Sequence, residues 1–149
     1  EVLFEAGDEL SATATGDEVP AFSGAVVAPG HATVDQPNAD DLVFSRDEDL
    51  VVTWDMTSPD GLLIAYLSAT DEGGTSSAIY CEWAMGAGDA AMPAALMAQL
   101  PAVSDAELSL YDHAGSVIVA GDWHIEIAAE GTPETDSDTA GFFGGITLD

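Results

Sequence analysis

Acidic residues gather in three clusters that have the composition of calcium-binding loops. Calcium takes about six to eight hard oxygen ligands, and loops dense in aspartate supply them. None of the clusters has the Asp-x-Asp-x-Asp-Gly run and distal glutamate of an EF-hand. The clusters are Asp47-Glu48-Asp49, Asp35 with Asn38-Ala39-Asp40-Asp41, and Asp136-Ser137-Asp138. The predicted calcium ligands, with the first cluster ranked ahead of the others, are Asp47, Asp49, Asp40, Asp41, Asp136 and Asp138.

Catalytic arrangements are not recognisable in the sequence. Glycoside hydrolysis needs two carboxyl groups at a defined separation, and nothing selects one pair out of 28 acidic residues. No Gly-x-Ser-x-Gly element occurs, and His31, His113 and His124 have no triad context. A zinc site is not indicated either, because the single cysteine, Cys81, lies far along the chain from His113 and His124. We therefore predict no catalytic residue, and calcium is the one cofactor that the composition suggests.

Aromatic residues offer a different chemistry, the stacking of rings on a sugar. In the expected strand register Tyr80 and Tyr111 point outward, so these two residues are the candidates for contact with a carbohydrate. Trp54, Trp83 and Trp123 fall on inward faces and are predicted to belong to the core.

The charge balance excludes two kinds of partner. The chain carries 28 acidic residues against a single basic one, Arg46, which gives a formal net charge of −27. A chain without lysine cannot neutralise nucleic-acid phosphates or read an anionic membrane surface. With 47% hydrophobic residues it also differs from an acidic disordered tail. The longest apolar stretch, residues 90–103, falls short of the ~20 residues of a membrane-spanning helix, so we predict no membrane insertion by this segment.

The elements that must position these residues follow a period of two. Short runs alternate polar and apolar residues between clusters of Gly, Pro, Asp and Asn, which is typical of an antiparallel β fold. We expect strands at residues 9–15, 22–27, 50–54, 62–69, 77–83, 106–112, 123–129 and 142–148. Weaker candidates lie at residues 2–5, 32–34, 42–44 and 116–119.

One short helix near residues 93–100 interrupts the strands. Pro93 stands near its first turn, helix formers follow, and Pro101 ends it. Segments 58–61 and 112–115 have turn composition and predict tight connections between strands. Together these elements predict an all-β fold, an antiparallel two-sheet β-sandwich that forms a single domain over residues 1–149.

Several short motifs along the chain follow one another in a familiar order. They are Val19-Pro20-Ala21-Phe22, Pro29, Leu50-Val51-Val52-Thr53-Trp54, Cys81, Met92-Pro93-Ala94-Ala95-Leu96, Leu100-Pro101 and Gly121-Asp122-Trp123. This layout resembles that of uncharacterised secreted proteins and lipoproteins of Gram-negative bacteria. The resemblance implies an immunoglobulin-like β-sandwich and an extracellular, periplasmic or cell-surface location in a bacterium. It implies no catalytic residue.

Three classes of function follow as alternatives. The first is a non-catalytic secreted or cell-envelope module with a structural or surface-interaction role. The second is a calcium-dependent module that binds a carbohydrate or a protein, and the third is a hydrolase that acts through carboxylates. An unpaired strand such as residues 2–5 would also allow self-association through a sheet edge. The charge predicts a salt-adapted protein whose stability rises with NaCl or with calcium.

Overall fold

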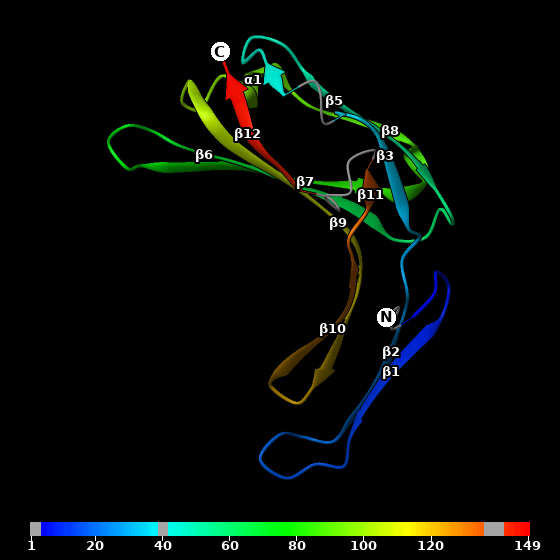
Figure 1. Cartoon of the computed structure of the whole chain (residues 1–149). Helices are drawn as coiled ribbons and strands as arrows, with labels where there is room; N and C mark the ends of the chain where they lie inside the picture. The colour runs from blue at the N-terminus through cyan, green and yellow to red at the C-terminus, as the bar shows by residue number, and fades with distance from the viewer. Residues whose placement is uncertain (1–3, 39–41, 136–141) are drawn as a thin grey trace.

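The computed structural model is built almost entirely of β-strands (Figure 1). It describes residues 4–38, 42–135 and 142–149. The strands are β1 (Glu9–Ala14), β2 (Phe22–Val27), β3 (Ala32–Gln36), β4 (Val43–Phe44), β5 (Leu50–Met56), β6 (Leu62–Thr70), β7 (Ser76–Ala84), β8 (Asp89–Met92), β9 (Val103–Ala120), β10 (Trp123–Gly131), β11 (Glu134–Thr135) and β12 (Phe142–Leu148). Helical turns form α1 (Ala94–Met97) and the 3-10 element η1 (Met85–Ala87). The prediction of an all-β fold with one short helix is confirmed.

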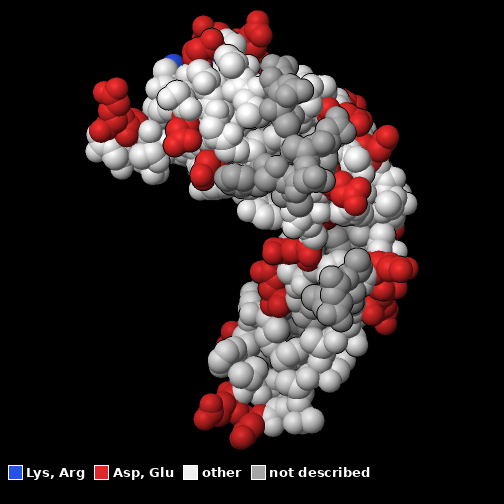
Figure 2. All heavy atoms as spheres, viewed as in Figure 1, with Lys and Arg blue, Asp and Glu red and all other residues white. Residues whose placement is uncertain are grey.

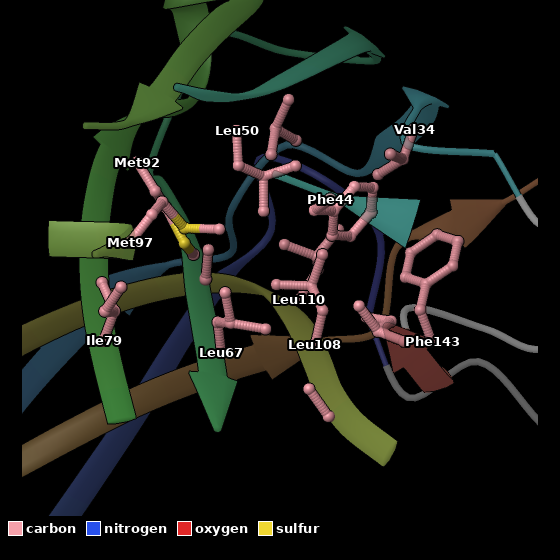
Figure 3. Packing of buried hydrophobic residues seen from close by; sticks show 14 of the residues in the cluster. Val34, Phe44, Leu50, Leu67, Ile79, Met92, Met97, Leu108, Leu110 and Phe143 are labelled. Carbon is pink, nitrogen blue, oxygen red and sulfur yellow. The ribbon is translucent and has the colours of Figure 1, made fainter. Parts of the chain in front are cut away.

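Two sheets share the main hydrophobic core. The larger sheet has the order β4-β12-β9-β6-β7, with β10 also paired to β9, and the smaller sheet has the order β11-β3-β5-β8. Leu67 and Leu108 of the larger sheet belong to one buried cluster with Val34 and Leu50 of the smaller sheet (Figure 3). Met97 of α1 joins the same cluster. The alternating apolar positions of strands from both sheets thus meet in one interior.

Strand β9 connects this core to the smaller strand group, which consists of β1, β2, β10 and the last part of β9 itself. It is 18 residues long, and its first part pairs with β6 and β12 while its last part pairs with β10. The antiparallel pair β1–β2 lies against β9 and β10 in the lower half of Figure 1. A Cβ atom at Gly24 of β2 would collide with Ile118 of β9 and crowd Ile127 of β10. The missing side chain at Gly24 therefore permits the close packing of the two strand pairs.

The structure shows that the turn predicted at residues 112–115 is wrong. This segment lies inside β9, where His113 pairs with Leu62 of β6 and with Glu130 of β10. Because β10 pairs with the whole segment and β6 with its first two residues, the segment stays extended despite its turn-like composition. The two strands predicted on either side of it are therefore one strand.

Burial of the tryptophans agrees with the prediction in the core and differs at the tip of β10. Trp54 is buried, its Nε1–H donates to the Met85 carbonyl oxygen at 2.8 Å, and its ring stacks on Trp83 with centroids 6.1 Å apart. Trp123, predicted to be buried, is 49% exposed. It pairs with Ala120 beside the turn that joins β9 to β10, and a side chain at such a tip has few neighbours to cover it.

The structure also differs from the predicted strands in two short strands and at the start of the chain. The sequence pattern did not predict β8 or β11, which have four and two residues. The strand expected at residues 2–5 begins outside the described residues, and Phe4 and Glu5 are not in a strand. Among the described residues, no helix has the length and apolar character needed to cross a membrane.

Candidate functional site

The predicted calcium ligands are placed only in part. Asp49 makes a structural contact. Its Oδ1 accepts a hydrogen bond from the Ala94 N–H at 2.7 Å, which gives this N–H of the first turn of α1 a partner. Asp47 is exposed, and its own N–H donates to Ser45 Oγ at 3.3 Å. The other four predicted ligands, Asp40, Asp41, Asp136 and Asp138, lie outside the described residues. Within the described ranges, no three side chains of His, Cys, Asp or Glu come together as metal ligands.

A cavity of about 760 Å³ opens where β9 leaves the main core for the smaller strand group. We call it the junction pocket. Its lining includes Phe4, Pro29, His31, Thr57, Asp112 and Glu134. These residues come from the chain start, the β2–β3 connection, the end of β5, and strands β9 and β11. The junction pocket therefore depends on the fold and on no local motif.

An Asp–His pair forms the floor of the junction pocket. Asp112 is 1% exposed and is the only charged side chain that is buried in the described part of the chain. Its Oδ2 accepts a hydrogen bond from His31 Nδ1 at 2.8 Å, and its Oδ1 accepts the Ala32 N–H at 3.2 Å. Burial raises the pKa of the Asp112 carboxyl above its usual value, although these two hydrogen bonds act in the opposite direction.

The pair fixes the orientation of the imidazole. An ionised carboxylate can only accept, so the bond to Asp112 keeps the proton of neutral His31 on Nδ1 and leaves a lone pair on Nε2. Nε2 lies 4.0 Å from Glu134 Oε1, which is too long for a hydrogen bond. The side chains of His31 and Glu134 are 38% and 74% exposed, so both can meet a ligand in the pocket.

A second feature is the tyrosine face, which we define as Tyr66, Tyr80 and Tyr111. Tyr66 of β6 lies directly opposite Tyr80 of β7, and Tyr111 of β9 lies opposite Ile64, two residues from Tyr66. The three residues are 42%, 57% and 42% exposed in that order. The outward position predicted for Tyr80 and Tyr111 is confirmed, and Tyr66 adds a third ring on the strand between them.

Acidic side chains of β7 and β10 lie near the tyrosine face. The Tyr80 hydroxyl donates to Glu82 Oε1 at 3.0 Å. This bond raises the pKa of Tyr80, and desolvation together with the charges of Glu82, Glu130 and Glu126 acts in the same direction. On the same side of β9, His113 Nδ1 lies 3.5 Å from Glu130 Oε1. The left side of the molecule is hollowed between the main core and the smaller strand group, and acidic side chains border this hollow (Figure 2).

Comparison with protein-family models, curated proteins and solved structures finds no match to this chain. Its function must therefore be inferred from the two sites. Sequence reasoning found two of the three tyrosines but missed the junction pocket. One signal for it was present, because Ala106, Leu108, Leu110 and Asp112 occupy alternate inward positions, and an aspartate that ends such a series is unusual.

Proposed function

We propose that the protein is a non-catalytic, secreted or cell-envelope module that binds a carbohydrate on the tyrosine face. The observation that carries the proposal is the display of three exposed tyrosines on adjacent strands of one sheet. Tyrosine is suited to this task because its ring is apolar and its hydroxyl exchanges hydrogen bonds at the rim. The C–H groups on one face of a pyranose ring can pack on such rings.

The charge near the tyrosine face narrows the class of sugar. Glu82 accepts from Tyr80, and Glu126 and Glu130 act electrostatically on the same ring. Carboxylates accept hydrogen bonds from sugar hydroxyls and repel anionic polysaccharides. Neutral glycans and amino sugars are therefore the proposed ligands.

Location and calcium complete the proposal. An exterior location, extracellular or periplasmic, rests on the resemblance to Gram-negative envelope proteins with an immunoglobulin-like sandwich, and the acidic composition agrees with it. Calcium dependence rests on the acidic clusters and is an arm of the test below. A hydrolase that acts through carboxylates receives less support, because both oxygens of the buried Asp112 carboxylate already accept hydrogen bonds, from His31 and from the Ala32 N–H.

A glycan array, followed by titration of each ligand found, tests the proposed function. Wild type is compared with Tyr66→Ala, Tyr80→Ala and Tyr111→Ala, each with calcium and with a chelator. Trp123→Ala is the matched control, because it removes an exposed aromatic ring at the far tip of β10. We expect each tyrosine variant to weaken binding about tenfold, as for the loss of ~1.4 kcal/mol of stacking. Equal effects of Trp123→Ala and the tyrosine variants, or no glycan bound at all, would contradict the proposal.

A further inference from the structure

The junction pocket is a separate site from the tyrosine face, and several of the backbone N–H groups in and beside its lining are already used within the protein, which leaves the hydroxyls of Thr57 and Thr132 as side-chain donors. The N–H groups of Glu5, His31 and Ala32 bond to Asp8 Oδ2, Thr57 Oγ1 and Asp112 Oδ1. The N–H groups of Gly30 and Thr57 bond to the carbonyl oxygens of Asp60 and His31, and Pro29 has none.

The acceptors of the junction pocket, by contrast, remain open. In the neutral ring, His31 Nε2 keeps a lone pair because Asp112 holds the proton on Nδ1. Glu134 places a carboxylate oxygen 4.0 Å from Nε2, and Glu5 also lines the pocket. Among the described residues that line the pocket there is no lysine or arginine, since the single Arg46 donates to the Ala98 carbonyl oxygen elsewhere. A ligand that uses His31 Nε2 and the Glu134 carboxylate together must donate hydrogen bonds, and the carboxylate favours a positive charge on it.

The distance between the two acceptor atoms of the pocket indicates how large the donor group of a ligand can be. His31 Nε2 and Glu134 Oε1 are 4.0 Å apart, which is too far for a bond between them. One nitrogen atom about 2.8–2.9 Å from both acceptors spans this gap and donates to each of them. An ammonium group has the donors and the size for that position, and Phe4 and Pro29 supply apolar surface for an attached alkyl chain.

We infer that the junction pocket binds an organic ammonium ion, which donates to His31 Nε2 and Glu134 while its alkyl part lies against Phe4 and Pro29. The same chemistry occurs in a free alkylamine and in a lysine side chain of a partner protein. Asp112 is a positioning residue in this site, because it sets the His31 tautomer without contact with the ligand. The inference is independent of glycan binding on the tyrosine face.

Titration with n-butylammonium chloride tests the inference, and the His31 imidazole signal is followed by NMR. The NaCl concentration is kept constant at about 0.5 M, because this salt screens the net charge. Tetramethylammonium is the control ligand, because it carries the charge without an N–H donor. We expect saturable binding of n-butylammonium that is at least about tenfold tighter than that of tetramethylammonium. Nα-acetyl-lysine N-methylamide distinguishes a lysine side chain of a partner protein from a free alkylamine. If it binds with the same affinity as n-butylammonium, the ligand is a lysine of a peptide. If only n-butylammonium binds, the ligand is a free amine.

Two variants report on the geometry. Glu134→Gln removes one acceptor charge from an exposed side chain and should weaken n-butylammonium about tenfold, whereas Glu72→Gln in the exposed β6–β7 connection should leave it unchanged. Asp112→Asn should move the His31 proton to Nε2 and abolish binding, which the ring signals show directly. No saturation, equal affinity for tetramethylammonium, or identical behaviour of Glu134→Gln and Glu72→Gln would overturn the inference.

Discussion

Asp112 combines two opposing effects in one side chain. Its burial disfavours the charged form, while hydrogen bonds from His31 and Ala32 favour it, and burial is the larger effect on its pKa. Removal of such a carboxylate leaves the donors that it satisfied without a partner. The residue therefore holds the β2–β3 connection against β9 at a cost that depends on pH.

The raised pKa of Asp112 predicts how this cost changes with pH. The folded protein takes up a proton at Asp112 at a higher pH than the unfolded chain does, so this residue destabilises the fold increasingly as pH rises through its folded pKa. In chemical unfolding between pH 4 and pH 8, the stability of wild type relative to Asp112→Asn should thus increase toward the acidic end. The same variant series at Asp105, an exposed carboxylate of β9, should show no such trend. A stability difference that grows with rising pH would falsify the assignment.

At the scale of elements, the smaller strand group has a thinner core than the two main sheets. Ile118 and Ile127 are only half-buried, whereas Leu67 and Leu108 of the main core are fully buried. Elements with few buried contacts open at lower free energy than the strands of a well-packed core. The β1–β2 pair should therefore separate from β9 and β10 before the main core unfolds.

Hydrogen exchange of Ile118→Ala measures this difference. The truncation should lower the opening free energy of β1, β2 and β10 by about 1–2 kcal/mol, since the residue is half-buried. Amides of β5 and β6 should lose a similar amount, because complete unfolding starts from the same destabilised folded state. Leu108→Ala is the comparison variant and should lower the protection of β5 and β6 by about 2–5 kcal/mol but leave that of β1 and β2 unchanged, because the main core stays folded when the smaller strand group opens. Equal loss in β5 and β1 after Leu108→Ala would show that the strand groups unfold as one unit.

The same scale shows what the sequence could predict. Alternation identified the longer strands, because one face of each is covered by the core. It failed at residues 112–115, where pairing of His113 with strands on both sides overrides a turn-like composition. It also could not reveal the junction pocket, since His31, Asp112 and Glu134 come from three distant segments that meet only through the crossing of β9. The tyrosine face was partly predictable, because outward positions follow from the strand period alone.

For the whole molecule, the net charge of −27 dominates the response to solvent. The ion pairs among the described residues involve only histidines, and Arg46 donates to a carbonyl oxygen. Almost every carboxylate thus lacks a cationic partner and repels its neighbours. In Figure 2 the acidic side chains are spread over both strand groups, so the repulsion acts on the whole surface that is visible.

Salt should therefore stabilise the fold. A comparison with calcium distinguishes screening of the charge repulsion from binding of the ion to the acidic clusters. Counterions shorten the range of repulsion from about 30 Å at 0.01 M salt to about 3 Å at 1 M, so the melting temperature should rise steadily with NaCl. KCl should act equally, because screening depends on ionic strength. Calcium at matched ionic strength should add a further rise only if the acidic clusters bind it, and Asp47→Asn should then reduce that rise while Asp71→Asn does not. Identical melts in chelator at low salt and in high salt would contradict the role of charge.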